Sequence, residues 1–430
     1  MTTLSTTSTL AVENANFRHL VADITWFGLA FTSTNRFLSV FALRLGASEA
    51  DLGWLTSLPA LLLAFSTTFA LAWRARRRST IDALALPGFI FRLVFLLPAL
   101  TPLMPPPWQI PWLVLSASIP ALGQGIASVM FVTGLQESVS QSRTTDLFSQ
   151  RSRSFNISLA LSAIVFGALL QKIPFPANYQ LMFIASFGFA LLSLWHCTRI
   201  EPIFVNQSPH YSSRAILAAW HTREFRSLVA TMVVTFVAFY SVYALVNYRL
   251  VEQLGADESY MALYALIELA AGAAISHYAP RIVARLGHRG ATAIAMALTA
   301  VPLVILATTT NLWVAAISAV ISGAAWTFVA MVGIVGLYVQ AVPVAEATAY
   351  GVAYHQIYGL AIFAAPFIGT FMITSDIQME HALVAGAGLR LLAGLAVGIS
   401  WWRHSHPRLS LSAIDPGVGV AQPDDGGMVG

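Results

Sequence analysis

The chain has 430 residues, of which 57% are hydrophobic and only 10% charged, and its formal net charge is +4 at pH 7. A soluble globular domain has about 25% charged residues, so this composition excludes an ordinary soluble protein and predicts a chain that lies in lipid. The single cysteine, Cys197, excludes an internal disulfide and a cysteine-based metal cluster.

The first residues are polar and lack a basic region followed by an apolar core, so we expect no cleavable signal peptide. Beyond them, apolar stretches of about 20 residues recur, the length that a helix needs to cross a bilayer. We predict twelve membrane-spanning helices, at roughly 19–43, 52–73, 81–101, 111–137, 154–173, 178–198, 226–250, 259–279, 291–310, 312–338, 347–373 and 381–402.

The longest polar stretch follows the sixth predicted helix and divides the chain into two groups of six. We therefore predict a polar cytoplasmic segment at 1–18, a six-helix bundle at 19–198, a central cytoplasmic loop at 199–225, a second six-helix bundle at 226–402 and a disordered cytoplasmic tail at 403–430. The predicted fold class is an all-α integral membrane protein of two six-helix bundles.

The basic residues predict the orientation, because they stay on the cytoplasmic side of short loops. With the N-terminus inside, most of the 23 lysines and arginines fall in inner segments, whereas the outer loops are acidic. We predict a multi-pass plasma membrane protein with both termini cytoplasmic. The basic balance then reflects this topology, and we expect no nucleic-acid partner.

A short phrase is repeated at the start of each group of helices. LGASE at 45–49 and LGADE at 254–258 both fall in the predicted outer loop after the first helix of a group. The two phrases are 209 positions apart, and the same separation relates Arg76 to Arg285. Each of these arginines lies in the predicted inner loop after the second helix of its group. Because six helices restore the same side of the membrane, the two bundles are predicted to be parallel repeats.

This architecture resembles the major facilitator superfamily of secondary transporters over roughly 17–402. The basic run ALAWRARRRST at 70–80 and its second copy HYAPRIVARLGHRGA at 277–291 are similar to the family's signature between helices 2 and 3. ALGQGIA at 121–127 is similar to its Arg-x-x-Gln-Gly pattern, with Ala121 in the arginine position. The fifth helix lacks the Gly-Pro signature of drug/proton antiporters, which argues against a classical drug–proton antiport mechanism.

Ionisable groups inside lipid are costly and mark candidate sites. Glu268 is the only acidic residue near the centre of a predicted helix. It could accept a proton in coupling, or it could form a structural pair with Arg390. Arg92 lies at mid-depth in the third predicted helix, and we expect it to have a structural role.

Arg36 lies just outward of the centre of the first helix, next to Asn35. The resemblance implies that this helix lines the central cavity, where an arginine could hold an anionic group through a bidentate fork. The alternative is a side chain that extends to the outer interface.

Other candidate substrate contacts are polar or aromatic residues within predicted helices. Tyr240, Tyr243 and Asn247 share a face of helix 7, and Trp326 lies on helix 10. They could line a cavity for an organic molecule or pack against neighbouring helices. His355 and Gln356 lie near the middle of helix 11, where a histidine with a satisfied hydrogen bond is the alternative to a site role.

Charged residues at the predicted inner ends suggest a gate. The same offset that relates the two bundles relates Glu137 to Glu346. Our hypothesis is that some acids pair with loop arginines when the inside is closed; the candidates are Asp23, Glu137, Glu346, Arg76, Arg285 and Arg289. The alternative is an arginine cluster that only reflects topology and has no defined partners.

The motifs HExxH, GxSxG and the P-loop are absent, so we expect no enzyme, no cofactor and no metal site. The sequence predicts a monomeric secondary transporter that moves a small organic solute across the bilayer by alternating access, with Glu268 favouring proton coupling. The alternative is a membrane receptor or assembly factor that uses the same fold without transport, and it would not need Arg36 and Glu268 to face a common cavity.

Overall fold

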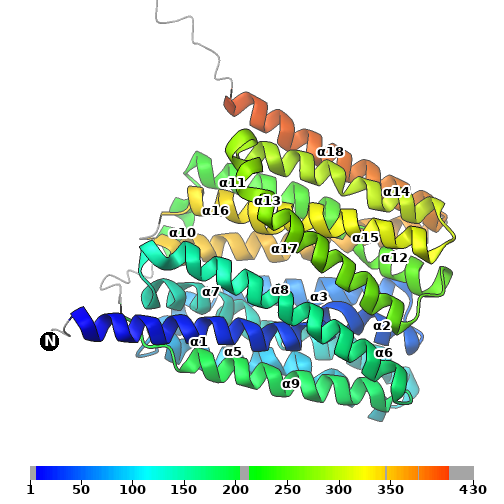
Figure 1. Cartoon of the computed structure of the whole chain (residues 1–430), viewed down its shortest axis with the longest axis horizontal. Helices are drawn as coiled ribbons and strands as arrows, with labels where there is room; N and C mark the ends of the chain where they lie inside the picture. Colours follow the sequence, from blue (N-terminus) through cyan, green and yellow to red (C-terminus); the bar gives the residue numbers. More distant parts are fainter. Residues whose placement is uncertain (1–5, 204–212, 344–345, 376, 406–430) are drawn as a thin grey trace, which may run out of the picture.

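The computed structural model describes residues 6–203, 213–343, 346–375 and 377–405, and all regular structure in these ranges is helical (Figure 1). The predicted tail lies almost wholly outside the described residues. The first half contains α1 (Thr6–Thr32), α2 (Leu38–Arg44), α3 (Glu49–Thr67), α4 (Ala70–Ala75), α5 (Thr80–Arg92), α6 (Pro106–Ser118), α7 (Ala121–Ser138), α8 (Gln141–Lys172) and α9 (Ala177–Thr198). The second half contains α11 (Arg223–Tyr240), α12 (Tyr243–Tyr248), α13 (Glu258–Leu298), α14 (Ala300–Thr308), α15 (Leu312–Thr327), α16 (Val335–Ala341), α17 (Ala347–Thr374) and α18 (Met379–Ser405), and the short α10 (Ser213–Ala219) precedes it.

Within the described residues, ten helical stretches are long and apolar enough to cross a membrane. One of them, Glu258–Thr308, covers two predicted spans, because α13 runs through the predicted inner loop and is interrupted only at Gly287 (φ 66°, ψ 170°). The predicted first span lies in α1 and α2, and α1 begins earlier, at Thr6. The all-α membrane fold is confirmed, and the helices are consistent with twelve spans.

The polar residues before the first predicted span are helical because they have partners at the inner end of the first half. The Asn16 side-chain nitrogen donates to the backbone oxygens of Ser138 (3.0 Å) and Glu201 (2.7 Å). The Glu13 carboxylate accepts from the backbone nitrogen and the hydroxyl of Ser140, at 2.9 and 2.7 Å. These bonds fix the start of α1 against the segments that follow α7 and α9.

Several predicted helices are interrupted where the sequence removes a backbone donor. Pro120 separates α6 from α7, and Pro98 and Pro102 lie in a 3₁₀ segment, Leu97–Leu103, after α5. Proline has no N–H and removes one hydrogen bond from the helical backbone. The predicted spans at 111–137 and 81–101 are therefore each built from more than one helical segment.

The repeated outer phrases form the same turn in both halves. Gly46 and Gly255 have positive φ, 88° and 71°, a conformation that favours glycine. Ser48 and Asp257 then cap the next helix, accepting from the backbone nitrogens of Asp51 and Tyr260. The local repeat predicted from the sequence is thus present in the backbone.

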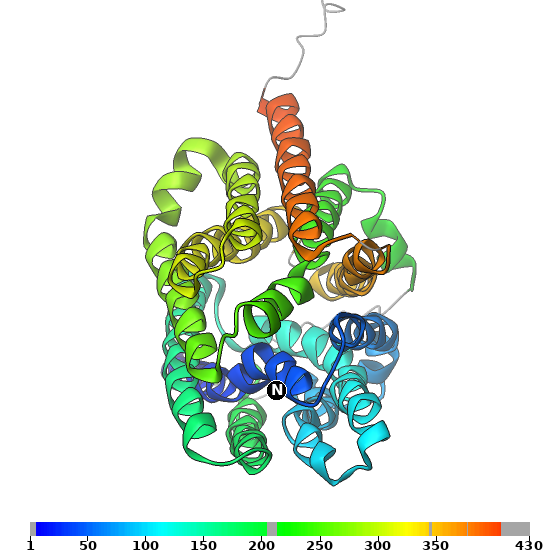
Figure 2. The same ribbon diagram turned by 90° about the vertical axis from the view of Figure 1, so that its right-hand side faces the viewer.

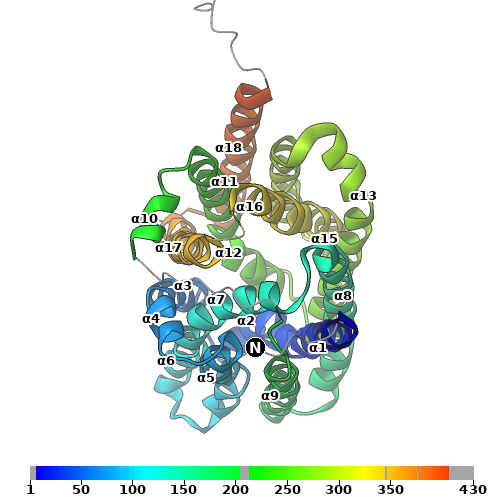
Figure 3. The ribbon, with the colours of Figure 1, turned by 90° about the vertical axis from the view of Figure 1, so that its left-hand side faces the viewer.

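Viewed along the helices, the two halves lie one above the other, with α1 to α9 below and α11 to α18 above (Figures 2 and 3). At the end that carries the two repeated turns, one hydrophobic core contains buried residues of both halves, such as Phe41, Leu52, Leu250 and Tyr264. We call this the predicted outer end. At the opposite, predicted inner end the buried clusters belong almost entirely to one half or the other.

An ion pair joins the two halves at the predicted outer end. Arg44 donates from Nε and Nη2 to the two carboxylate oxygens of Glu258, at 2.8 and 3.0 Å. The Tyr179 hydroxyl also reaches Glu258 at 3.3 Å. Below this pair α8 and α13 are in close contact, since a Cβ on Gly167 would lie 2.6 Å from the Cβ of Ala262.

Candidate functional site

A central cavity of about 380 Å³ lies between the two halves. Its walls come from α1 to α3 and α5 to α7 on one side and from α11, α12, α13, α15 and α17 on the other. The predicted site residues that line it are Asn35, Arg36, Tyr240, Tyr243, Glu268 and Trp326. Because these residues come from both halves, any relative movement of the halves changes the shape of this cavity.

Arg36 and Glu268 form an ion pair across the cavity, Nη1 to Oε2, and so join the first half to the second. Their side chains are only 22% and 15% exposed. The pairing of Glu268 with Arg390, one of the two interpretations of the sequence, is not formed. Arg390 instead donates to the backbone oxygens of Thr299 (2.9 Å) and Phe239 (3.0 Å).

The backbone is unusual near both charged residues: it is π-helical at Arg36, and it is packed very closely against a neighbouring helix at Glu268. Arg36 lies in a π-helical segment, Ser33–Phe37, between α1 and α2; such segments occur often at functional sites. A Cβ on Gly323 of α15 would lie 2.1 Å from the backbone oxygen of Glu268. Only glycine therefore lets α15 approach α13 at this point, and this contact fixes the depth at which Glu268 enters the cavity.

Aromatic rings form one wall of the cavity. Tyr240 and Tyr243 are separated by a break between α11 and α12, yet their ring centroids are 5.7 Å apart. The Trp326 ring stacks on Phe239 at 3.6 Å and meets Tyr240 edge to face at 5.8 Å. The tyrosines therefore both pack against neighbours and line the cavity, so the two interpretations of the sequence coincide here.

A second, smaller cavity of about 40 Å³ shares part of its lining with the central one. Asn247 and Arg390 line only this second cavity, while the shared residues are Asn35, Arg36, Phe239, Tyr243, Glu268 and Ser322. Asn247 thus lines the smaller cavity and not the central one.

Gln124 lines the central cavity and was not among the predicted site residues. It lies in the motif ALGQGIA, between two glycines whose Cβ atoms would meet neighbouring helices: Gly123 at 2.5 Å from the oxygen of Pro87, and Gly125 at 2.1 Å from the hydroxyl of Ser66. The glycines let α7 pack closely on α3 and α5 while Gln124 faces the cavity. A polar residue between two glycines in a membrane helix is a signal that could have identified it.

His355 and Gln356 do not line either cavity. The His355 Nδ1 lies 2.8 Å from the backbone oxygen of Gly351, which is the satisfied histidine that the sequence left as an alternative. Gln356 donates to the hydroxyl of Thr68 at 3.1 Å and so links α17 to the first half near its inner end.

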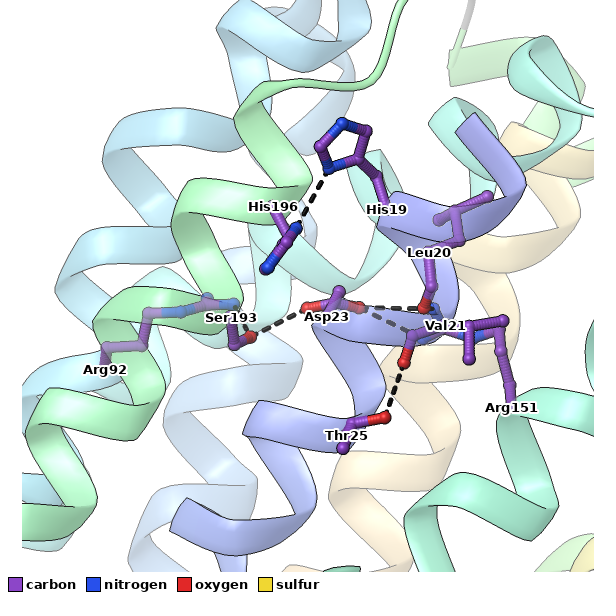
Figure 4. Close-up of polar contacts among 9 residues, drawn as sticks. All are labelled: His19, Leu20, Val21, Asp23, Thr25, Arg92, Arg151, Ser193 and His196. Carbon is purple, nitrogen blue, oxygen red and sulfur yellow. Dashed lines mark hydrogen bonds and ion pairs between the residues drawn. The ribbon is translucent and has the colours of Figure 1, made fainter. Parts of the chain in front are cut away.

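Asp23 belongs to a buried network inside the first half (Figure 4). Arg151 donates from Nη1 and Nη2 to one Asp23 carboxylate oxygen, both at 3.2 Å, and Ser193 donates to the other at 2.7 Å. Arg92 donates to the Ser193 hydroxyl at 2.9 Å and to two backbone oxygens. This agrees with a structural role for Arg92 and gives Asp23 a partner, Arg151, that the gate hypothesis did not include.

Two histidines lie beside this network. The Nδ1 atoms of His19 and His196 are 2.9 Å apart, and Figure 4 shows them on the two helices that carry Asp23 and Ser193. Such a contact requires one ring to donate and the other to accept, so at most one of the two Nδ1 atoms carries a proton. The contact therefore depends on at least one neutral imidazole.

The remaining gate candidates are not joined to one another by any ion pair among the described residues. Glu137 is buried at the end of α7, where burial raises its pKa above the ordinary 4.5, against a hydrogen bond from Thr80 and the charge of Arg74. Glu346, Arg76 and Arg285 are exposed, and Arg289 contacts the hydroxyl of Ser400 at 3.4 Å.

The sequence matches the family model of the Major Facilitator Superfamily over residues 25–408. No curated protein matches the chain. Among solved structures, the fold is similar to the xylose transporter XylE from E. coli (15% identity, 88% of this chain and 96% of that chain, TM-score 0.66). It is also similar to a mutant of the nucleoside transporter NupG (12%, 90% and 100%, 0.68) and to the human organic anion transporter MFSD10 (13%, 90% and 99%, 0.65).

Proposed function

The chain belongs to the major facilitator superfamily of transporters, and from this premise we propose that it is a secondary transporter that moves a small organic solute through the central cavity by alternating access. The observation that carries the proposal is the Arg36–Glu268 ion pair, which lies in that cavity and joins the two halves. We further propose that Glu268 couples this movement to protons.

The size and lining of the cavity support a small organic solute. A volume of about 380 Å³ falls within the range of ligand sites, which are roughly 300–1,000 Å³. Its aromatic wall offers apolar contact, and Gln124, Asn35 and Thr34 offer hydrogen bonds. The similar folds include sugar, nucleoside and organic anion transporters at low identity, so the substrate class must be argued from the side chains of this chain.

The distribution of the core supports alternating access. The predicted outer end has one core shared by both halves, whereas the predicted inner end has separate ones. Apolar contact between the halves is thus concentrated at one end, as expected for a state that is closed outside and more open inside.

The basic inner segments predict a plasma membrane orientation with both termini cytoplasmic, and we expect a monomer.

The proposed role of Glu268 follows from charge. An ion pair in a poorly hydrated cavity is much stronger than one in water. A proton that moves from water onto the Glu268 carboxylate removes its charge and weakens its hold on Arg36. Protonation would therefore loosen the link between the two halves and free Arg36 for the solute.

The rival function is a receptor or assembly factor with the same fold. It does not need a charge pair from both halves in one cavity, and the position of Arg36 and Glu268 therefore favours transport.

The first experiment is a thermal-shift screen of the purified protein with small organic solutes at about pH 6 and pH 8. A ligand that binds only the folded state stabilises it by about 2.7 kcal/mol at 100 times its dissociation constant. Native protein is compared with Glu268→Gln and with Glu252→Gln, a matched control at an exposed glutamate.

Each hit is then measured for uptake into proteoliposomes with and without a pH gradient. Uptake that the gradient drives in native protein and in Glu252→Gln, but not in Glu268→Gln, is the expected result. Uptake independent of the gradient would remove the proton role, and binding without any uptake would favour the rival function.

A further inference from the structure

The second cavity contains a buried arginine that is not fully satisfied. Arg390 is 2% exposed, and its Nη1 and Nη2 donate to the backbone oxygens of Thr299, in the turn between α13 and α14, and of Phe239 in α11. Its Nε is buried and has no hydrogen-bond partner among the described residues. A buried donor without a partner is costly, and a buried charge without a counterion is more so.

Arg390 is held in a fixed position. Its guanidinium carbon lies 4.4 Å from the centroid of the Phe239 ring, and that ring is itself stacked on Trp326, with the ring centroids 3.6 Å apart. The arginine is therefore anchored by a stacked ring and two carbonyls before any ligand arrives. A guanidinium fixed in this way is suited to hold an anionic group because little side-chain freedom is lost on binding.

The charges that line the second cavity do not balance. The lining includes two arginines, Arg36 and Arg390, and one carboxylate, Glu268. With all three ionised, the sum is one positive charge. One further negative charge would neutralise the cavity.

The two volumes divide the site into a large and a small part. About 40 Å³ in the second cavity is room for a few water molecules, since one needs roughly 10–15 Å³ on the same measure. That space suits a carboxylate-sized group, while the aromatic central cavity suits a larger apolar body. Arg36 and Ser322 are among the residues that line both spaces, so they lie where the two cavities adjoin.

We propose that the second cavity is an anion subsite, which holds a carboxylate-sized monoanionic group of the solute between Arg36 and Arg390 while the rest of the solute lies against Tyr240 and Trp326. This inference rests on the proposed function. It gives the solute a class: a small organic acid with an apolar or aromatic body.

The subsite also explains why Glu268 lies where it does. Arg36 is bound to Glu268 in this structure, so the solute carboxylate must compete with Glu268 for the same guanidinium. A proton on Glu268 removes that competition and raises the positive charge of the cavity by one. Anion binding should therefore be tighter at lower pH, as long as the solute itself stays ionised.

The test measures equilibrium binding to the purified full-length protein in detergent with a chloride-free sulfate buffer. The probes are sodium benzoate, its neutral isostere benzamide, sodium acetate and sodium chloride. The readouts are the melting temperature and tryptophan fluorescence, to which Trp326 in the cavity wall contributes as one of 11 tryptophans. Benzoate should give a saturable response, acetate a response at least tenfold weaker, and benzamide and chloride no saturable response.

Three variants locate the site. Arg390→Gln should weaken benzoate at least tenfold, whereas Arg281→Gln, at an exposed arginine of α13, should not. Because Arg390→Gln could disturb folding, Ser322→Leu is the second variant. It adds a bulky side chain where the two cavities adjoin, leaves Arg390 in place, and should also abolish the benzoate response.

Four results would overturn the subsite. The first is equal responses to benzoate and benzamide, and the second is a chloride response equal to that of benzoate. The third is no response to any carboxylate at about 10 mM, a concentration at which a ligand with only about 4.1 kcal/mol of binding free energy would register. The fourth is a benzoate response unchanged by Ser322→Leu. These results do not decide the proposed transport function, because binding in detergent requires no transport. The uptake measurement tests that function separately. Uptake of a neutral solute without anion binding would leave the transporter and remove the subsite.

Discussion

The pair Arg36–Glu268 sets the energy scale of the site, because neither side chain forms an ion pair with any other residue that the structure describes. Removing one member of a buried pair leaves a desolvated charge and costs about 3–5 kcal/mol in the fully buried case. These side chains keep 22% and 15% of their exposure. A smaller penalty is therefore expected.

We predict that Arg36→Gln and Glu268→Gln each lower the free energy of unfolding by about 2 kcal/mol. The double variant should lose clearly less than the sum, because it leaves no unpaired charge. Melting temperatures of the four proteins in one detergent measure the coupling. Strictly additive losses would show that the two residues do not act on each other.

Two buried glutamates at the predicted inner end, outside the apolar stretches that the structure shows to be long enough to cross a membrane, should have pKa values shifted in opposite directions. Burial would raise the pKa of Glu13, but the hydrogen bonds from Ser140 and the charge of Arg143 outweigh it and hold the pKa below 4.5. Glu13 thus contributes stability above its unfolded pKa, and this is lost as the pH falls through its folded pKa. The pKa of Glu137 is raised, so its contribution is present at low pH and is lost as the pH rises through the raised pKa.

We therefore predict that Glu13→Gln lowers the melting temperature relative to native protein near pH 7, and that the difference shrinks as the pH falls toward about 4. Glu137→Gln should do the reverse: its melting temperature should gain on that of native protein as the pH rises from about 4.5 to 7. The measurement is a melting series across this range for all three proteins. Parallel curves for the two variants would contradict the assignment.

At the scale of residues, the sequence predicts where charged side chains lie in the helices but not which residues they pair with. Arg36 and Glu268 could be predicted as candidates for a site because ionisable groups in apolar helices are costly. For Tyr240 and Trp326 the sequence left two alternatives open, lining a cavity or packing against neighbouring helices. The partner of Glu268 could not be predicted, since it lies in the other half of the chain and depends on how the halves meet. Arg151, the partner of Asp23, is one of the basic residues of the predicted inner segments, which the sequence relates only to membrane topology.

At the scale of helices, the repeated turn is the clearest link from sequence to structure. Gly46 and Gly255 have positive φ, and a Cβ at either would meet no atom within 4 Å. Substitution there is strained by the backbone alone. An L-residue in this region costs about 1–2 kcal/mol, and asparagine tolerates it better than alanine.

We predict that Gly46→Ala and Gly255→Ala each destabilise the protein by about 1 kcal/mol, with Asn costing less at both positions. Gly188→Ala is the matched control, because Gly188 is helical in α9 and also has open space around its Cβ. It should cost nothing. A loss at only one of the two turns would mean that the turns are not equivalent, despite their shared phrase.

The positions of most helices could be predicted, whereas their interruptions could not. Runs such as 178–198 and 381–402 are seen as α9 and α18 with nearly the same bounds. The break after Tyr240 has no proline or glycine to announce it. It lies where α17 comes close, since a Cβ on Gly369 would be 2.2 Å from the oxygen of Ser241. Such a contact is a property of packing and is absent from local sequence.

At the scale of the whole molecule, closure of the predicted outer end combines an ion pair with close helix packing. The Arg44 side chain is 46% exposed, and exposed pairs contribute only about 0–1 kcal/mol. The contact of Gly167 with Ala262 is buried and leaves no room for a larger side chain. The packing of α8 on α13 should therefore hold this end closed more strongly than the pair Arg44–Glu258 does.

The accessibility of the central cavity from the predicted outer side tests this order. We place a cysteine at Ser39, which lines the cavity, and label it in proteoliposomes with a membrane-impermeant maleimide; the native Cys197 is buried. Arg44→Glu should raise the labelling rate by about fivefold or less, the factor for 1 kcal/mol, and adding Glu258→Arg should reverse it. Gly167→Val should raise the rate further, because the two helices must separate to admit the side chain, whereas Gly188→Val on α9 should not. If Arg44→Glu had the larger effect, electrostatics would close this end, and high salt would then open it.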